Sequence, residues 1–314
     1  MMRVSRRLFL QGAGAFAWAA AGTGSYALAF EPALRLNITS YKLCPPRWPE
    51  ELVLKAAVLA DIHACEPWMP ASRIRGIANL TNDLKPDIVF LLGDFAGGHN
   101  FVTGPVFPGE WGEALSILRA PLGVFAVLGN HDWWHGPLPN RPGDNAEGVR
   151  QALRAANVGV LENHALRLSQ NGTPFWVAGL GDQLAGFIGP AGFATHDDLD
   201  ATLRQIKDDA PIILLAHEPE IFRRVPERIS LTLCGHTHGG QICVPVPVPP
   251  GLARWQHLVR WQRELQKAYG HRDEGGRHLI ISAGLGTSYV PIRFLRPPEV
   301  VMVTLGRAME PPRS

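Results

Sequence analysis

Five apolar stretches of the chain each end in a cluster of residues that can bind metal, and this regularity limits the possible fold most strongly. The stretches are Val53–Ala60, Ile88–Leu92, Val124–Leu128, Ile212–Ala216 and Leu231–Cys234. Short apolar runs of this kind indicate strands buried on both faces. The clusters that follow them are Asp61-Ile62-His63, Gly93-Asp94, Gly129-Asn130-His131-Asp132, His217 and Gly235-His236-Thr237-His238. Because ligands of open α/β sheets bind at the carboxyl ends of strands, we expect the five clusters to meet in one cleft.

The regions between these stretches carry helical and strand patterns in alternation. Helices are expected at Ser72–Leu84, Trp111–Leu118, Glu147–Ala156 and Asp197–Ile206. Shorter strands are expected at Val160–Leu161, Ala165–Leu168, Phe175–Ala178, Leu279–Ser282 and Val300–Leu305. No internal repeat or second domain boundary interrupts this order. We therefore predict one α/β domain over residues 52–307, preceded by a linker at 30–51 and followed by a tail at 308–314.

The spacing within the clusters predicts which side chains converge. Extended backbone has a period of two, so Asp61 and His63 are expected to point the same way while Ile62 points back into the fold. His236 and His238 repeat this device, with Thr237 turned away. Asp94, Asn130 and His236 each follow a glycine. These glycines permit the tight turns and the close approach of loops that a crowded centre requires.

The candidate ligands are two carboxylates, one amide oxygen and four imidazoles. A mixed nitrogen and oxygen set without thiolate suits Mn, Fe or Zn more than Ca or a structural zinc site. Seven ligands are too many for one catalytic ion with an open position, but they suit two divalent ions about 3.5–4 Å apart that share a carboxylate. Such a centre keeps a positive charge and is expected to hold a hydroxide and an anionic substrate. The seven residues are Asp61, His63, Asp94, Asn130, His217, His236 and His238.

In the order and spacing of these motifs, the chain resembles the calcineurin-like metallophosphoesterases from about Leu52 to Leu305. The resemblance implies an α/β fold, a four-layer αββα sandwich with two central mixed sheets. It also implies that Asp94 bridges two metals. The first metal would be held by Asp61, His63, Asp94 and His238, and the second by Asp94, Asn130, His217 and His236.

The same resemblance assigns catalytic roles to two further residues. His131 matches the family's catalytic histidine, near the leaving-group oxygen, and Asp132 would orient and charge that histidine. One departure is visible: Phe95-Ala96-Gly97-Gly98 follows Asp94 where many members have an acidic or aromatic pattern, which leaves the wall beside Asp94 undefined.

The implied function is hydrolysis of a phosphoester, most simply a phosphodiester, by attack of a metal-bound hydroxide. The alternatives are a phosphomonoesterase and a metal-binding module that has lost catalysis. His131 and Asp132 argue against the inactive module, because neither is needed to hold the ions. The sequence contains no Gly-x-Ser-x-Gly motif, so it gives no sign of a serine hydrolase of that kind.

A narrower resemblance concerns an exported, membrane-associated branch of phosphodiesterases. It rests on the paired arginines Arg6 and Arg7 near the start of the chain, on Gly235–Gln241, on Gly284-Leu285-Gly286-Thr287-Ser288 and on Pro291-Ile292-Arg293-Phe294. Relatives of that branch hydrolyse the pyrophosphate of UDP-2,3-diacylglucosamine. This resemblance implies a lipid-linked or nucleotide-sugar pyrophosphate as substrate and a membrane surface as partner.

Residues 1–29 are expected to be an export signal. Ser5-Arg6-Arg7-Leu8-Phe9-Leu10 resembles a twin-arginine signal, and Ala27-Leu28-Ala29 is a small-x-small cleavage pattern. An ordinary secretion signal with two chance arginines is the alternative. Twin-arginine export carries folded proteins, so the domain is expected in the periplasm or on the outer face of the cytoplasmic membrane. Whether the signal is removed or kept as an anchor stays open.

The charge of the remaining chain argues against nucleic acid as a partner. The whole sequence has 30 Lys and Arg against 28 Asp and Glu. Residues 1–29 contain Arg3, Arg6 and Arg7 and no acid, so their removal leaves 27 basic and 28 acidic residues, a net charge of −1. A near-neutral domain offers no electrostatic footprint for a phosphate backbone.

Some residues outside the centre have two possible roles. Arg293 and His135 are candidates for substrate binding; Arg293 is otherwise a structural hydrogen-bond donor and His135 an ordinary surface residue. Trp133 and Trp134 are expected to pack or line the rim of the cleft. A basic amphipathic helix within Gly251–Gly270 either docks on the domain or lies on a membrane. Cys234 and Cys243 flank the histidine-rich turn, and buried thiols are favoured there over a disulfide. Sequence alone does not pair the four cysteines Cys44, Cys65, Cys234 and Cys243.

Overall fold

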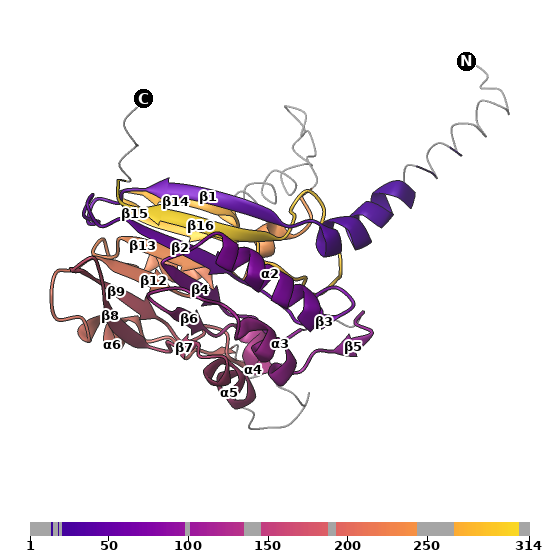
Figure 1. Cartoon of the computed structure of the whole chain (residues 1–314), viewed down its shortest axis with the longest axis horizontal. Helices are drawn as coiled ribbons and strands as arrows, with labels where there is room; N and C mark the ends of the chain where they lie inside the picture. Colours follow the sequence, from indigo (N-terminus) through magenta and orange to yellow (C-terminus); the bar gives the residue numbers. More distant parts are fainter. Residues whose placement is uncertain are drawn as a thin grey trace, which may run out of the picture.

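The computed structural model describes residues 14, 18, 21–97, 101–134, 146–187, 193–243 and 267–307. Two six-stranded sheets face each other in this part of the chain (Figure 1). The first has the order β1 (Asn37–Leu43), β16 (Glu299–Leu305), β2 (Leu54–Leu59), β4 (Ile88–Leu92), β6 (Val124–Val127) and β7 (Gly159–Val160). The second has the order β14 (Gly270–Glu274), β15 (Arg277–Ile281), β13 (Leu231–Cys234), β12 (Ile212–Leu215), β9 (Thr173–Gly179) and β8 (His164–Gln170).

Both sheets are mixed, with parallel strands at their centres. β2, β4 and β6 run parallel, whereas β16 is antiparallel to β2. In the second sheet β9, β12, β13 and β15 are parallel, and the edge strands β8 and β14 are antiparallel to their neighbours. The carboxyl ends of the parallel strands therefore lie at one edge of each sheet, where ligands of α/β proteins bind.

The central strands are buried on both faces, as their continuous apolar sequences predict. In β2, Leu54, Ala56 and Val58 enter the core between the sheets, while Ala57 and Leu59 face the helices outside. β4 repeats this alternation, with Phe90 between the sheets and Leu91 outside. A strand that contacts apolar partners on both sides keeps no polar face, which explains the lack of period-two polarity in these stretches.

Helices cover the outer face of each sheet and complete four layers. α2 (Ala71–Asp83), α3 (Pro108–Leu115) and α5 (Glu147–Ala155) pack on the first sheet, and α6 (Leu199–Arg204) and the 3-10 helix η3 (Pro219–Arg223) pack on the second. The predicted four-layer αββα fold is confirmed. The remaining elements are the π-helical segment η1 (Tyr26–Leu34), α4 (Asn130–Trp134), η4 (His238–Gly240), and the short pairs β3 (Cys65–Glu66) with β5 (Gly104–Pro105) and β10 (Gly186–Phe187) with β11 (Phe193–Ala194).

The segment 30–51, expected to be a linker, contains an edge strand. Residues 37–43 form β1, which pairs in parallel with β16. Tyr41 and Leu43 pack against the core between the sheets, while Ser40 and Lys42 are exposed. This strand lacks a continuous apolar run because only one of its faces is covered, and its alternating pattern is too short to stand out in the sequence.

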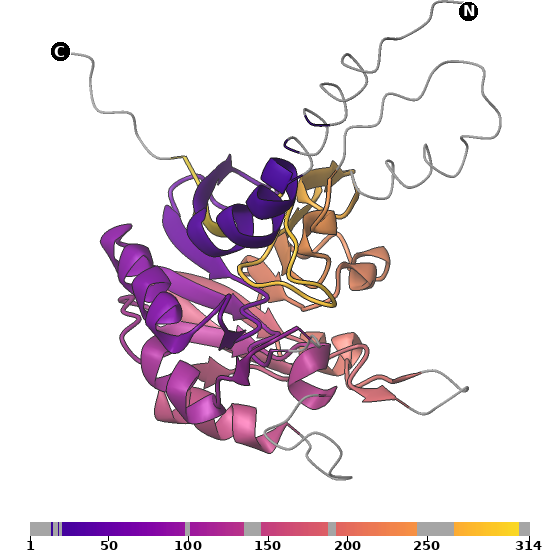
Figure 2. The same cartoon turned by 90° about the vertical axis from the view of Figure 1, so that its right-hand side faces the viewer.

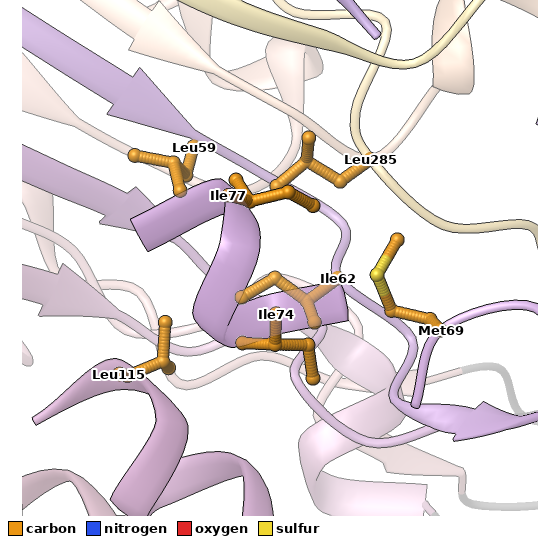
Figure 3. Close-up of a pocket in the computed structure, with 7 residues that line it drawn as sticks. All are labelled: Leu59, Ile62, Met69, Ile74, Ile77, Leu115 and Leu285. Carbon is orange, nitrogen blue, oxygen red and sulfur yellow. The ribbon is translucent and has the colours of Figure 1, made fainter. Parts of the chain in front are cut away.

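The residue between the first two candidate ligands points away from the expected centre. Ile62 lies in an apolar pocket under α2, together with Leu59, Met69, Ile74, Ile77, Leu115 and Leu285 (Figure 3). Ile62 is 2% exposed. Its burial anchors the loop after β2, so that its neighbours on either side are turned toward the facing loops.

Several predicted features fall outside the described residues. They are most of the export signal, Gly98, His135, the helix within Gly251–Gly270 up to residue 266, and the tail 308–314. Among the described residues, no helix has both the length and the apolar character needed to cross a bilayer.

Candidate metal centre

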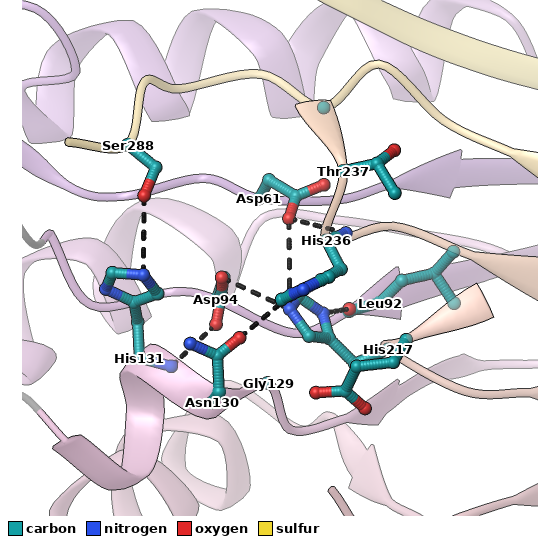
Figure 4. Close-up of polar contacts among 12 residues, drawn as sticks. Asp61, Leu92, Asp94, Gly129, Asn130, His131, His217, His236, Thr237 and Ser288 are labelled. Carbon is teal, nitrogen blue, oxygen red and sulfur yellow. Dashed lines mark hydrogen bonds and ion pairs between the residues drawn. The ribbon is translucent and has the colours of Figure 1, made fainter. Parts of the chain in front are cut away.

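The loops after β2, β4, β6, β12 and β13 bring the seven predicted ligands together. Figure 4 shows Asp61, Asp94, Asn130, His217 and His236 of this set. Three groups of side chains have ligand atoms within 4.8 Å of one another and can hold a metal ion: Asp61 with His63 and His238, Asp94 with His217 and His236, and His63 with Asp94 and His131. The first two groups follow the two ligand sets that the family resemblance implies. The clusters meet because each follows the carboxyl end of a parallel strand.

The backbone reaches this arrangement through left-handed residues, not through extended ones. φ is 52° at Asp61, 46° at His63 and 56° at Asp94, and 70° and 51° at His236 and His238. The expectation that extended backbone aligns each pair is therefore wrong, although both pairs do converge. A left-handed residue costs roughly 1–2 kcal/mol, so this strain is concentrated at the ligands.

The first group joins the loop after β2 to the loop after β13. Nε2 of His63 lies 3.0 Å from Nε2 of His238, and Nε2 of His238 lies 3.8 Å from Oδ1 of Asp61. Nδ1 of His63 lies 3.1 Å from the carbonyl oxygen of Ala96. A proton on Nδ1 then donates to that carbonyl and leaves Nε2 free to bind a metal.

The second group joins the loops after β4, β12 and β13, and Asn130 approaches it from the loop after β6. Nδ1 of His236 lies 3.0 Å from Oδ1 of Asn130, and Nδ1 of His217 lies 2.6 Å from the carbonyl oxygen of Leu92. The carbonyl of Leu92 again favours a proton on Nδ1, which leaves Nε2 of His217 for a metal. Thr237 is turned away, as expected, and its hydroxyl donates to the carbonyl of Ala268.

Asp94, a member of the second group, also faces the first group. Its Oδ2 is 3.4 Å from Nε2 of His63 and 3.2 Å from Nε2 of His217. Its Oδ1 accepts a hydrogen bond of 2.9 Å from the backbone N–H of His131. One carboxylate oxygen thus faces a ligand of each group, which is the position that a bridging carboxylate requires.

Unpaired polar atoms show that these residues fit a metal. Oδ2 of Asp61 and Nε2 of His217 are buried and have no hydrogen-bond partner. A buried polar atom without a partner carries a desolvation penalty of about 1–3 kcal/mol. Nε2 of His217 faces the centre, 3.2 Å from Oδ2 of Asp94. The other carboxylate oxygen of Asp61, Oδ1, lies 4.0 Å from Nε2 of His217 and 3.8 Å from Nε2 of His238. Aspartate and histidine are both residue types that bind divalent cations.

Burial also keeps several of the imidazoles neutral. It lowers the pKa of His63 to about 3 and lowers the pKa of His236. Burial, together with His63 and Arg293, lowers the pKa of His238 well below its ordinary value. Neutral imidazole is the form that binds metal, so these three side chains are in the binding form at physiological pH.

The carboxylate of Asp94, in contrast, stabilises a positive charge. Burial alone would raise the pKa of Asp94, but His217 and His131 hold it well below its ordinary range. Burial opposes a proton on His217, yet Asp94 raises the pKa of His217 well above its usual value. A positive charge beside Asp94 is therefore favoured, whether it is a proton on His217 or a metal cation.

Asp132 has a structural role that the sequence did not predict. Its Oδ2 accepts hydrogen bonds of 2.9 Å from the N–H groups of Asp94 and Gly129, and its Oδ1 accepts bonds of 2.8 and 3.1 Å from Phe95 and Ala96. Both oxygens are therefore occupied by backbone amides. Asp132 joins the loop after β4 to the loop after β6 and positions Asp94. Its expected effect on the imidazole of His131 stays a prediction.

His131 lies at the edge of the centre beside the loop that follows β15. Its Nε2 is 3.3 Å from the hydroxyl oxygen of Ser288. Its ring centroid is 4.7 Å from that of His63 and 6.4 Å from that of the exposed Tyr289. Ser288 was not singled out as a site residue, although it belongs to the Gly284–Ser288 motif, because a serine 157 positions away gives no spacing signal.

Arg293 is also placed differently from the expectation. It is 0% exposed, and its guanidinium donates to the carbonyl oxygens of Ala283, Gly286 and Arg296. Its Nη2 lies 3.3 Å from Nδ1 of His238. Arg293 therefore holds the loop after β15 against the first ligand group and is not open to a substrate phosphate. Of the two roles considered for Arg293, the structure therefore supports that of a structural hydrogen-bond donor.

The other predicted residues take structural positions. Trp133 stacks on His196 with ring centroids 4.4 Å apart, and Nε1 of Trp134 donates to the carbonyl of Leu184. Both tryptophans thus pack near the edge of the centre. Cys44, Cys65, Cys234 and Cys243 are free thiols, of which Cys65 and Cys234 are buried.

Comparisons with known proteins agree with this geometry. The profile of the calcineurin-like phosphoesterases matches residues 54–240. The uncharacterized metallophosphoesterase YkuE of Bacillus subtilis is 28% identical over 97% of this chain and 99% of its own length. The phosphodiesterase YaeI of Escherichia coli is 29% identical over 96% of this chain and 99% of its own. The putative metallophosphoesterase F40B5.2 of Caenorhabditis elegans is 31% identical over 79% of this chain. The matched part covers 48% of that relative, about half of its length.

The chain belongs to the calcineurin-like phosphoesterase family. With clusters of aspartate and histidine able to bind metal at its centre, it is a metallophosphoesterase, a hydrolase of phosphoesters.

The glycines that precede the ligands allow the loops to approach closely, as expected. A Cβ on Gly129 would lie 2.4 Å from Oδ1 of Asp94 and 2.6 Å from Cε1 of His217. A Cβ on Gly235 would lie 2.8 Å from Oδ2 of Asp61. The positions of Asp61, Asp94 and His217 therefore require that these two residues have no side chain.

We predict that Gly129→Ala displaces Asp94 and His217 and weakens metal binding roughly 10–100-fold, the range seen when groups that orient ligands are changed. Equilibrium dialysis against Mn²⁺ measures this effect. Gly76→Ala is the matched control, because Gly76 is exposed in α2 and a Cβ there meets nothing within 4 Å. Wild-type metal affinity in Gly129→Ala would contradict the close approach of the loops.

Proposed function

We propose that this protein is a phosphodiesterase that uses two divalent ions, chosen from Mn, Fe and Zn. The observation that carries the proposal is the position of Asp94, whose Oδ2 faces His63 on one side and His217 on the other. When bound, two such ions activate a water and stabilise the negative charge that develops on the phosphoryl oxygens. Asp61, His63, Asp94 and His238 would hold the first ion, and Asp94, Asn130, His217 and His236 the second.

His131 is the residue in this proposal that acts on the leaving group. Its imidazole is 5% exposed at the edge of the centre and lies beside both His63 and Asp94, so a phosphoryl group held there comes within its reach. His131 donates a proton to the departing oxygen as a general acid. The hydroxyl of Ser288 beside Nε2 orients the ring.

A phosphodiester is preferred to a monoester because the E. coli relative that aligns along nearly its whole length is named a phosphodiesterase. Within that class we propose a lipid-linked or nucleotide-sugar pyrophosphate, such as UDP-2,3-diacylglucosamine, as the substrate. The exposed aromatic ring of Tyr289 beside His131 supports a substrate with an apolar or aromatic part. The competing function, a metal-binding module without catalysis, leaves the position of His131 unexplained.

A screen of substrates in the presence of Mn²⁺ tests the function. We expect turnover of bis-p-nitrophenyl phosphate and of lipid pyrophosphates to exceed that of p-nitrophenyl phosphate. Asp94→Asn removes a negative charge from the bridge and is expected to lower the occupancy of both sites and abolish activity. Absence of turnover with any phosphoester at full metal loading would favour the inactive binding module, and full activity of Asp94→Asn would contradict the bridge.

We predict that His131→Ala keeps most of the bound metal and loses activity roughly 10²–10⁴-fold, the usual contribution of a general acid. The loss is expected to shrink for substrates with a nitrophenolate leaving group, because that group departs without a proton. Steady-state kinetics across a series of leaving groups measures this dependence. An equal loss across the series would assign His131 to positioning of the phosphate instead.

The proposal extends to the compartment in which the enzyme works. The twin-arginine-like sequence at Arg6 and Arg7 supports export of a folded protein, and folding before export allows the ions to be loaded inside the cell. We propose a location on the outer face of the cytoplasmic membrane or in the periplasm, with the twin-arginine machinery as a partner. Replacement of Arg6 and Arg7 by lysine is expected to leave the protein in the cytoplasm with its metal centre intact. Cell fractionation measures where the double variant is found. Normal export of that variant would indicate the general secretory route.

A further inference from the structure

The residues around the expected cleavage pattern are part of the folded domain. The carbonyl oxygen of Ala27 accepts a hydrogen bond of 3.0 Å from the backbone N–H of Arg293. The carbonyl oxygen of Leu28 accepts a bond of 3.0 Å from Nε1 of Trp68. Ala27 is buried at 8% exposure, and both residues belong to the π-helical segment η1. The backbone that a leader peptidase would have to bind is therefore already engaged.

The second half of η1 is fixed by a buried carboxylate and an arginine. Glu31 is 0% exposed and accepts hydrogen bonds of 3.1 and 2.6 Å from the backbone N–H groups of Leu295 and Arg296. From α2, Arg73 donates to the carbonyl oxygens of Pro32 and Arg35. Both oxygens of this buried carboxylate accept hydrogen bonds, and loss of either bond would lower the stability of the fold. Detachment of η1 from the domain is therefore unfavourable.

The same contacts connect η1 to the metal centre. Figure 2 shows η1 in indigo beside the yellow loop that follows β15. Arg293 of that loop donates its backbone N–H to Ala27, while its side chain lies 3.3 Å from His238. Release of η1 would therefore remove a support from the loop that carries Ser288 and Arg293.

The outer surface of η1 is apolar, although its inner surface carries Glu31. Leu28, Phe30 and Leu34 are 43%, 47% and 74% exposed. This is the reverse of an ordinary amphipathic helix on a soluble domain, and it suits a segment that lies at a lipid surface. Leu295, in the loop that η1 contacts, adds a further exposed apolar side chain.

We propose that the export signal is not removed, and that η1 stays docked on the rim of the metal centre as the start of a membrane tether. The inference rests on the proposed export of the folded protein. Proteases take their substrates as extended chain, and cleavage concentrates in segments that are free of the fold. In the folded domain, Ala27-Leu28-Ala29 is helical and hydrogen-bonded to the rest of the protein. It is therefore neither extended nor free of the fold.

Cleavage by purified leader peptidase in detergent tests this directly, without any measurement of hydrolase activity. The substrates are a peptide of residues 1–40, the full chain, and the full chain with Glu31→Gln and Arg73→Gln. We expect the peptide and the double variant to be cut after Ala29 and the native chain to be cut at least about tenfold more slowly, because proteolysis follows the population of the opened segment.

Arg75→Gln is the matched control, since Arg75 also lies in α2 but pairs with the exposed Glu113. This variant is expected to resist cleavage like the native chain. Rapid cleavage of the native chain would overturn the proposal. An uncut peptide, or a double variant as resistant as the native chain, would overturn docking as the cause of retention.

Flotation with vesicles of phosphatidylethanolamine and phosphatidylglycerol tests the tether. The full chain is expected to float with the vesicles, and the cleaved double variant to stay in the soluble fraction. A full chain that does not float would overturn the tether while leaving the metal centre and its chemistry untouched.

Discussion

The carboxylate of Asp132 makes the contact on which the metal centre depends. It accepts hydrogen bonds from four backbone N–H groups, one in the loop after β6 and three in the loop after β4. Four buried amides would otherwise lack partners, each at a cost of about 1–3 kcal/mol. Because these bonds join the two loops, they also determine where Asp94 stands relative to Asn130 and His131. The other ligands are arranged around that position.

The centre concentrates both charge and backbone strain, and this has consequences for stability. Asp61, Asp94 and His217 are almost fully buried, and five ligand residues have left-handed backbone. Such an arrangement is costly in the folded chain and absent from the unfolded one. Cation binding would offset this cost only in the folded state, so metal affinity and folding stability are linked. The apolar layers on both sides of β2 and β4 supply the rigidity that keeps the strained loops in place.

Much of this structure was predictable from the sequence, and the exceptions have physical reasons. Continuous apolar runs identified the parallel strands, and the polar residues after them identified the seven residues that converge. The left-handed backbone at Asp61 and His236 was not predictable, because side-chain type alone does not reveal φ. The structural contacts of Asp132 and Arg293 were not predictable either, because hydrogen bonds to distant backbone leave no pattern in the chain. β1 was missed since an edge strand covered on one face has no apolar run.

We propose that Asp94 joins two ions, and anomalous diffraction from crystals loaded with Mn²⁺ distinguishes this arrangement from a site for one ion. The proposed function predicts two anomalous peaks about 3.5–4 Å apart, as in other two-metal sites, with the Asp94 carboxylate between them. One peak is expected beside Asp61, His63 and His238, and the other beside Asn130, His217 and His236. A single peak at full loading, or two peaks of which only one contacts Asp94, would contradict a bridging role for Asp94.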